Sequence, residues 1–458
     1  MRRQDPVFLT DWTKDLPTVV RGEGIYLFAE DGTKYIDAAS GVKVASLGHG
    51  VKEIVDAMAA QAQRLAFAYT GAFQNLPQIE LGKRLVRFAP AGFVKAYFTS
   101  GGSEAVEVAI KLARQYQLAK DRPSRYKVVS RWNSYHGATL GAMSLTGQPR
   151  RRQDYLPLLI DFPHILPVYC YRCPLGKSYP ACAVACAHDL ERTIRLEGEA
   201  SISGFIAEPV LGSSGNGLSG PPEYFPILRD TCDRFDILLI ADEVITGVGR
   251  TGRNFAIEHW GVTPDLIVTG KGLSGGYSPL GAVLIHQRVW EVLEREHREG
   301  MFLGYTYSGN PVACATGVAA LDYIERHDLV GRAAARGDQL GRRLQSLAGR
   351  ATVGEIRGKG LLWGIEFVAD KVTRAPFRPP GAFANAVARE ALRRGLYLNV
   401  GSSDSVDGAY GDNIGLAPPL VTSAEEIDLI IEILGDAIAA AEATMLHRQR
   451  EGLTHAPA

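Results

Sequence analysis

The sequence predicts an α/β fold, with a mostly parallel sheet covered by helices and a second, smaller α/β domain. First, short apolar runs alternate with longer helical segments between about residues 90 and 330. Second, five of these runs end in polar or glycine-rich residues, and parallel α/β sheets bind ligands at that edge. Third, 458 residues with 46% hydrophobic content suffice for one large core and a smaller domain.

The composition excludes several classes of protein. The formal net charge is zero, which argues against a protein that binds nucleic acid or a membrane surface. The start at residues 1–6 has no apolar segment behind it that would make a signal peptide, and no apolar stretch is long enough to span a bilayer. We therefore expect a cytoplasmic protein without nucleic-acid or membrane partners.

The first segment predicts short strands at Gly24–Phe28 and Lys34–Asp37, which flank a turn at Asp31 and Gly32. These strands form an arm outside the alternating region. The expected parts of the chain are an N-terminal arm at 1–60 that contributes to the small domain, a large domain at 61–330 with a cysteine-containing insertion at about 165–190, a small domain at 331–446, and a frayed tail at 447–458.

The small domain is predicted from its own strands and its last helix. The strands are Leu361–Phe367 and Leu396–Val400. The helix begins near Ser423, because Glu426 stands three residues later and completes a capping box.

The five apolar runs of the large domain are expected to place their following residues at one edge of the sheet. They are Ala96–Thr99 before Ser100–Ser103, Lys127–Ser130 before Trp132–His136, Gly204–Ala207 before Glu208, Ile237–Ala241 before Asp242, and Leu266–Thr269 before Lys271.

Lys271 is the most informative residue of this set. It lies at the end of a predicted strand among small residues, where an amine can form a Schiff base with a carbonyl. A lone lysine in such a loop is more often a solvated charge or a phosphate contact. It is not a Walker A lysine, because that motif needs glycine at position 265 and serine or threonine at 272, where this chain has Asp265 and Gly272.

The other strand ends offer partners for one carbonyl cofactor, pyridoxal 5′-phosphate (PLP). Free N–H groups at Gly102 and Ser103 favour a phosphate at the start of the next helix, although helix capping explains the same residues. Asp242 ends an apolar strand, and a pyridinium nitrogen would supply its partner; an N-cap or a salt bridge is the alternative. Tyr135 and Val244 suit the two faces of a ring, or simple core packing.

Two further patterns lead away from this interpretation. Residues 247–252 match G-x-G-x-x-G, but five residues separate the match from the strand and no helix start follows, so NAD binding is not expected.

Four cysteines lie close together and suit a structural zinc or four reduced thiols. We favour thiols and assign no metal ligand. The four cysteines are Cys170, Cys173, Cys182 and Cys186.

Taken together, these residues resemble the class III (ω-) aminotransferase family, PLP-dependent enzymes of fold type I, over nearly the whole chain. The resemblance implies a large domain built on a sheet of the seven-stranded type. The matching motifs are Ser100-Gly-Gly-Ser-Glu-Ala105, Tyr135-His-Gly137, Ala207-Glu-Pro-Val210, Ala241-Asp-Glu-Val-Ile-Thr-Gly-Val-Gly-Arg-Thr-Gly252, Thr269-Gly-Lys-Gly-Leu-Ser-Gly-Gly276, Gly304-Tyr-Thr-Tyr-Ser-Gly-Asn-Pro311 and Ala417-Pro-Pro-Leu420.

The resemblance implies a role for each matching residue and an obligate homodimer. Lys271 forms the Schiff base and moves the proton, Asp242 binds the pyridine nitrogen, Tyr135 and Val244 cover the two faces of the ring, Gly102 and Ser103 hold the phosphate, Glu208 supports the pocket, and Thr306 reaches the phosphate of the partner subunit.

The function implied is transfer of an amino group from an amine or amino acid to a keto acid, through the Lys271 Schiff base and pyridoxamine phosphate. A PLP-dependent lyase or racemase of the same family is the main alternative; an NAD-dependent oxidoreductase and a non-catalytic binding protein are the others. Many members of the family hold the carboxylate of the amino acceptor with an arginine, at positions where this chain has Gly408 or Gly415. Ser213 also replaces the acidic residue that gates the site in the ornithine-type members. Arg250 or another arginine could substitute, but the sequence does not place one.

Overall fold

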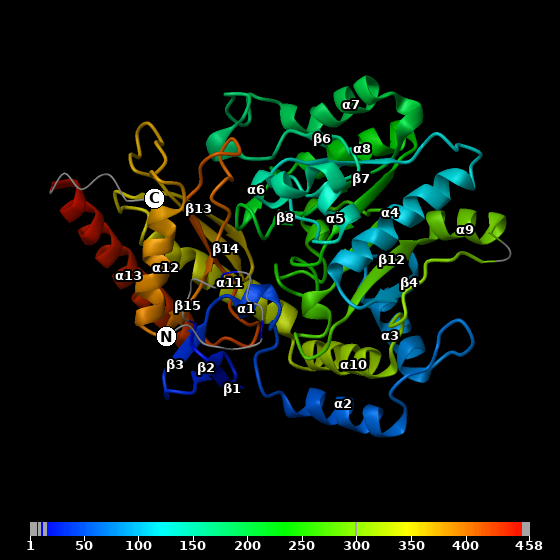
Figure 1. Ribbon diagram of the computed structural model, residues 1–458, viewed down its shortest axis with the longest axis horizontal. Coiled ribbons are helices and arrows are strands. Elements are labelled where there is room, and N and C mark those ends of the chain that lie inside the picture. The colour runs from blue at the N-terminus through cyan, green and yellow to red at the C-terminus, as the bar shows by residue number, and fades with distance from the viewer. Residues whose placement is uncertain (1–6, 8–10, 12–15, 298–299, 451–458) are drawn as a thin grey trace.

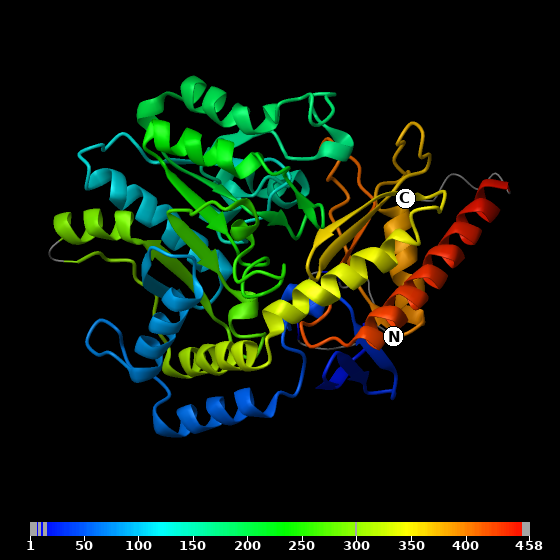
Figure 2. The ribbon, with the colours of Figure 1, turned by 180° about the vertical axis from the view of Figure 1, so that it is seen from behind.

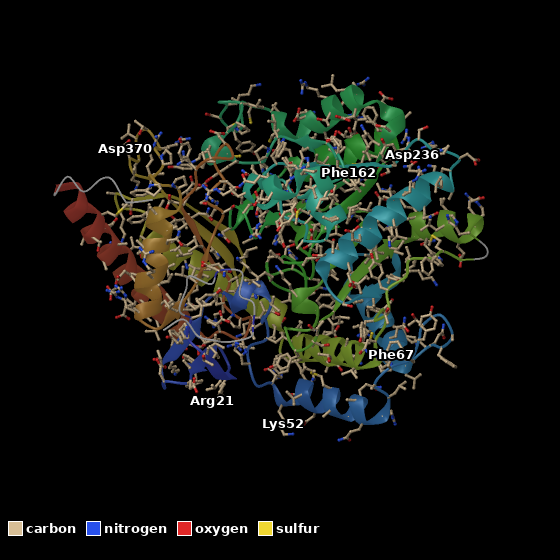
Figure 3. The ribbon with its side chains drawn as sticks, in the orientation of Figure 1. Arg21, Lys52, Phe67, Phe162, Asp236 and Asp370 are labelled. Atoms are coloured by element: carbon tan, nitrogen blue, oxygen red, sulfur yellow. The ribbon has the colours of Figure 1, made fainter. Side chains whose placement is uncertain are left out.

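The computed structural model describes residue 7, residue 11 and residues 16–297 and 300–450, with the side chains of 446–450 excepted. Figure 1 shows a large sheet with its helices on one side of the molecule and a smaller group of strands and helices on the other. Of the labelled side chains in Figure 3, Asp236 belongs to the large group and Asp370 to the small one.

The large sheet has seven strands and is mostly parallel, as predicted. Only β12 runs antiparallel to both of its neighbours, β4 and β11. In spatial order the strands are β4 (Phe93–Thr99), β12 (Gly281–His286), β11 (Leu266–Thr269), β10 (Leu238–Asp242), β7 (Ile202–Ala207), β5 (Lys127–Arg131) and β6 (His164–Ile165).

Strand β10 shows why the centre of the sheet reads as a continuous apolar run. Leu239 and Ala241 pack into one buried cluster, while Leu238 and Ile240 pack into another. Both faces of a parallel sheet are covered by helices, so alternate residues enter different cores. Each such fully buried leucine or isoleucine stabilises the fold by about 1.5–3 kcal/mol.

Helices on the two faces supply the remainder of the two cores. The second cluster contains α4 (Gly102–Leu118), α5 (Leu140–Leu145) and α9 (Gln287–Glu296). The first contains α3 (Leu76–Phe88), α7 (Ala185–Glu197), α8 (Tyr224–Phe235) and α10 (Pro311–Arg326).

The smaller group is built on an antiparallel sheet in the order β13 (Val353–Lys359), β14 (Leu362–Phe367), β17 (Asn413–Leu416) and β16 (Asn399–Val400). Helix α12 (Ala382–Arg393) packs against α13 (Ala424–Arg450), which also packs against α11 (Leu329–Gln345). Figure 2 shows α10 along the lower edge of the large group, with α2 (Lys52–Arg64) beside it, and α11 leading from the end of α10 to the smaller group.

The predicted capping box at the start of α13 is confirmed. The Ser423 N–H donates to the Glu426 carboxylate (2.8 Å), and the Glu426 N–H donates to Ser423 Oγ (3.1 Å). The helix continues to Arg450, past the predicted start of the frayed tail at 447. Residues 451–458 of that tail lie outside the described part of the chain.

The single strand predicted at Leu396–Val400 is wrong. The chain crosses there from one sheet to another, with β15 (Leu396–Tyr397) parallel to β3 (Lys34–Asp37) and β16 antiparallel to β17. Leu396 and Leu398 are both buried, so the apolar alternation continues across the break and conceals it. The strands of the N-terminal sheet are β1 (Val19–Glu23), β2 (Tyr26–Ala29), β3 and β15.

The remaining short elements are α1 (Ser40–Lys43), α6 (Pro149–Arg152), β8 (Val210–Leu211), β9 (Leu218–Ser219) and several short 3-10 helices. Among the described residues, no helix is long and apolar enough to cross a membrane.

Candidate functional site

The parallel strands end around one cavity of about 310 Å³. All but one of the predicted site residues line it, although they come from five separate segments of the chain. The predicted residues in its wall are Gly102, Ser103, Tyr135, Glu208, Asp242, Val244 and Lys271.

The strands explain this convergence. Because β7, β10 and β11 are parallel neighbours, their carboxyl ends bring Glu208, Asp242 and Lys271 to the same edge of the sheet. Lys271 itself has φ 41°, a left-handed conformation that is uncommon for a residue with a side chain. Such backbone is found preferentially at functional sites, where the surrounding structure holds it in place.

The Lys271 ammonium is held in surroundings that disfavour its charge. Burial lowers the pKa of Lys271 to about 8, against the opposing attraction of Asp242 and Glu208, and the positive charge of Arg151 lowers it further. A substantial fraction of the amine is therefore neutral at slightly alkaline pH. A neutral amine is the form that can act as a nucleophile or accept a proton.

Asp242 is only 4% exposed, yet both of its carboxylate oxygens have partners. The Val244 N–H donates to Oδ1 (3.1 Å). His136 Nδ1 lies 2.7 Å from Oδ2, and it must carry the hydrogen because a carboxylate only accepts. These bonds give both carboxylate oxygens of Asp242 a partner and fix the carboxylate at the wall of the cavity.

His136 is a site residue that the sequence assignment missed. It is 3% exposed, lines the cavity, and its Nε2 has no partner in the described part of the chain. The only signal in the sequence was its place after Tyr135 in a matching motif. A histidine there does not reveal that its partner stands more than a hundred residues later.

Glu208 joins two loops at the edge of the cavity. Its carboxylate accepts hydrogen bonds from the N–H groups of Tyr135 (2.9 Å) and Gly212 (3.0 Å). Burial raises the pKa of Glu208, with the nearby Asp242 acting in the same direction. Glu208 thus fixes the backbone that carries Tyr135.

The start of α4 forms a cradle with free N–H groups. Gly102 is the first residue of the helix, and no side chain caps this end. Ser103 Oγ accepts a hydrogen bond from the Ala138 N–H (3.1 Å). A Cβ on Gly102 would lie 2.7 Å from a methyl carbon of Val244, so a larger residue here would displace Val244 or the helix start. An uncapped helix start beside a cavity is suited to an anion such as a phosphate.

Several residues considered in the sequence lie elsewhere. Thr306 is in an exposed turn and is absent from the cavity wall. Arg250 is 2% exposed and donates to the carbonyl oxygens of Leu361 and Pro418 and to Ser40 Oγ, so it does not substitute as a carboxylate-binding arginine. Gly415 lies in β17, against Asn216.

The glycines at 247–252 make tight turns and do not open a helix. A Cβ on Gly252 would lie 2.8 Å from Ala334 of α11. The segment is therefore packed against α11, and it lacks the helix start that the dinucleotide fingerprint needs.

The four clustered cysteines line a second, much smaller cavity of about 20 Å³ and form no disulfide. Burial raises the pKa of the Cys186 thiol to about 11, and it also raises the pKa of Cys170. Within residues 16–297 and 300–450, no group of three or more histidine, cysteine, aspartate or glutamate side chains has the geometry to hold a metal ion.

Known proteins resemble this chain along most of its length. The family model of the class III aminotransferases matches residues 10–438. The uncharacterized aminotransferase YodT of Bacillus subtilis strain 168 is 36% identical over 428 residues, which cover 93% of this chain and 96% of the relative. A diaminobutyrate–2-oxoglutarate transaminase of Halomonas elongata is 36% identical over 422 residues, which cover 90% of this chain and 88% of the relative.

A solved structure agrees in fold. The ω-transaminase of Pseudomonas jessenii in complex with PMP superposes with a TM-score of 0.88 at 34% identity, covering 96% of this chain and 94% of that one. The enzymes of this family depend on PLP, and their substrates are small amines or amino acids and keto acids. With a family match over nearly all of its residues, this chain belongs to the class III aminotransferases.

Proposed function

We propose that this protein binds PLP in the 310 Å³ cavity and moves an amino group from a small amine or amino acid to a keto acid, with Lys271 as the Schiff-base residue. One observation carries the assignment. A lysine with a lowered pKa, a hydrogen-bonded carboxylate and an uncapped helix start face the same cavity. Each is common alone, but an electron-withdrawing ring with a phosphate needs all three.

The residues present fit this cofactor. The N–H groups at Gly102 and Ser103 would bind the phosphate, and Asp242 would bind the pyridine nitrogen. Tyr135 and Val244 would cover opposite faces of the ring. The cavity volume lies at the lower end of the range for small-molecule sites, about 300–1,000 Å³.

The bound cofactor supplies an aldehyde for the Schiff base and a ring that withdraws electrons from the substrate carbon. Lys271, whose pKa is lowered to about 8, would be the base that takes up the proton of the substrate carbon and gives it back. His136 and the Val244 N–H hold the Asp242 carboxylate in position, where it would accept a hydrogen bond from the ring nitrogen. Glu208 holds the loop that presents Tyr135.

We also propose a homodimer in which Thr306 contacts the phosphate in the partner's site. Thr306 lies beside exposed aromatic residues, among them Phe302 (93% exposed) and Tyr307 (62%). Phe67, labelled in Figure 3 on the segment between α2 and α3, makes an edge-to-face contact with Tyr307. Exposed apolar patches of this kind mark protein interfaces.

The same proposal includes the domain division. The arm at 1–60 is assigned to the small domain at 331–446, supported by the pairing of β3 with β15, and residues 61–330 form the large domain.

The test is a half-reaction. Purified protein saturated with PLP receives one amine or amino acid at a time, without keto acid, and its absorption spectrum is recorded. Conversion of the pyridoxal form to the pyridoxamine form, stopping at one equivalent of product, is the expected result. Continued product release with the pyridoxal form restored would identify a lyase or racemase.

Two variants show which lysine is responsible. Lys271→Ala is expected to abolish both the conversion and the trapping of PLP by borohydride. Lys52→Ala, at a side chain 83% exposed on α2, is the matched control and should behave as the wild type. Full conversion in Lys271→Ala would refute the assignment.

A further inference from the structure

The cavity contains more positive charge than the chemistry assigned to it uses. Besides Lys271, the wall contains Arg151 and also Val42, which directly precedes Lys43. Arg151 is among the charges that lower the pKa of Lys271, so the two cations lie close enough to repel each other. Asp242 and Glu208 in the same wall offset part of this positive charge, and an anion that enters the cavity would offset the rest.

The Arg151 side chain is held in position without using all of its hydrogen-bond donors. On the short α6, its Nε donates a hydrogen bond to Gln148 Oε1 (2.5 Å), and its guanidinium carbon lies 4.8 Å from the ring centroid of Tyr135. Its two terminal nitrogens have no hydrogen bond or ion pair in the part of the chain that the structure describes. The planar end of the side chain is therefore held over the aromatic ring and remains free to bind an anion.

The neighbours of Arg151 are engaged elsewhere. Arg150 donates to Ser403 Oγ (2.7 Å), and its N–H donates to Asp404. Arg152 lies over the ring of Trp132 and contacts His164. Neither lines the cavity, so of these three consecutive arginines only Arg151 is available to a ligand.

Lys43 adds a second cation without a partner. It is 6% exposed, and among the described residues no acceptor forms a hydrogen bond or ion pair with its ammonium. Burial lowers the pKa of Lys43 to about 7, with Lys271, Arg250 and Arg151 acting in the same direction and Glu208 opposing them. A buried cation is costly unless an anion pairs with it.

The backbone holds Lys43 in this position. Ser40 and Lys43 have φ of 47° and 64°, which side chains rarely allow. The segment is fixed by Ser40 Oγ, which donates to the Ala417 carbonyl (2.7 Å), and by the Gly41 N–H, which donates to Asp37. This strained turn keeps a lysine beside the cavity, and strain of this kind clusters at functional sites.

We propose that Arg151 binds the carboxylate of the substrate, with Lys43 as the buried second cation that favours an anion in the same cavity. The inference rests on the proposed function, since a keto acid acceptor brings a carboxylate into the cavity. Arginine suits this task because its planar fork forms two parallel hydrogen bonds with a carboxylate. The three positions considered from the sequence do not serve, because Arg250 is engaged with buried oxygens and positions 408 and 415 are glycines.

The test compares donors that differ only in the carboxylate. PLP-saturated wild type and Arg151→Met receive L-alanine or ethylamine, and 4-aminobutyrate or propylamine, in half-reactions. Arg151→Met is expected to slow the two carboxylate donors by about 10- to 100-fold and to leave the two simple amines unchanged. Arg150→Met, which removes the same charge outside the cavity, is the matched control.

A binding measurement accompanies the kinetics. The dissociation constant of succinate, an unreactive dicarboxylate, is measured by calorimetry on the PLP-saturated protein. Arg151→Met should weaken it by a similar factor, Arg151→Lys by less, and Lys43→Met by about 3- to 10-fold. Unchanged affinity in Lys43→Met would remove Lys43 from the site.

The outcomes separate the two proposals. If Arg151→Met slows amines and carboxylate donors equally, Arg151 only positions Tyr135. If it slows neither, Arg151 does not touch the substrate. Either result overturns the inference. If none of the donors converts the pyridoxal form of the wild type, the proposed function fails. The succinate affinities of wild type and Arg151→Met then still decide whether Arg151 binds a carboxylate.

Discussion

Gly102→Ala tests whether Val244 and the start of α4 form one cofactor surface. The added Cβ would lie 2.7 and 2.9 Å from the two methyl carbons of Val244. Non-bonded carbon atoms prefer about 3.5–4.0 Å, so Val244 or the helix start must retreat by about 0.8 Å or more. Both groups are assigned to the cofactor, one to its ring and one to its phosphate.

The magnitude follows from the cost of overpacking, typically about 1–3 kcal/mol. If the displaced groups return only when PLP binds, the dissociation constant for PLP rises by about 5- to 150-fold. The apo-protein should lose little stability, because alanine is favoured over glycine in a helix by up to about 1 kcal/mol.

The assay is equilibrium binding of PLP to the apo-protein, with urea unfolding of the apo-protein alongside it. Gly101→Ala is the matched control, because its φ of 178° is extended and a Cβ there meets no atom within 4 Å. It should bind PLP nearly as the wild type does. Wild-type affinity in Gly102→Ala, or an equal loss in both variants, would refute the reasoning that joins Gly102, Val244 and the cofactor.

Three further predictions follow from the same contacts. The rate at which the apo-protein forms a Schiff base with pyridoxal should rise about tenfold per pH unit and level off near pH 8. The reason is that burial lowers the pKa of Lys271 to about 8 and only the neutral amine reacts. A rate that levels off near pH 10 would contradict this. His136→Phe should weaken PLP binding by about 5- to 150-fold in the equilibrium binding assay, since Asp242 loses a hydrogen bond. His136→Asn keeps a donor and should lose less affinity. Equal losses in the two variants would assign His136 a packing role. Ser423→Ala should lower the free energy of unfolding in urea by about 0.5–2 kcal/mol by removing the cap of α13, while Ser423→Asp should retain most of it.

The parts of the site predictable from the sequence are those that depend on local order. Asp242, Glu208 and Lys271 each follow a short apolar run, and parallel pairing of those runs brings the three residues together without further information. The capping box at Ser423 was predictable for the same reason, since both partners lie within one turn.

The parts that escaped prediction depend on contacts between distant segments. His136 meets Asp242 across more than a hundred residues, and Arg151 is separated from Arg150 and Arg152 only by the direction in which each side chain points. The break between β15 and β16 is hidden because both sheets bury the same alternation of leucines. Periodicity gives the face of a strand but not the sheet that it joins.

Arg250 shows how a motif can match a family without its residues touching the ligand. It lies in the segment that follows Asp242, yet its guanidinium joins the carbonyls of Leu361 and Pro418 to Ser40 Oγ. Ser40 Oγ in turn donates a hydrogen bond to the Ala417 carbonyl, and Ser40 begins the turn that places Val42 in the cavity wall. One buried side chain thus ties three distant segments to the wall of the site. The family motif in this region therefore contains residues that hold the cavity wall together. By the present proposal, the specificity of the cavity depends on residues such as Arg151, which lie outside the matching motifs.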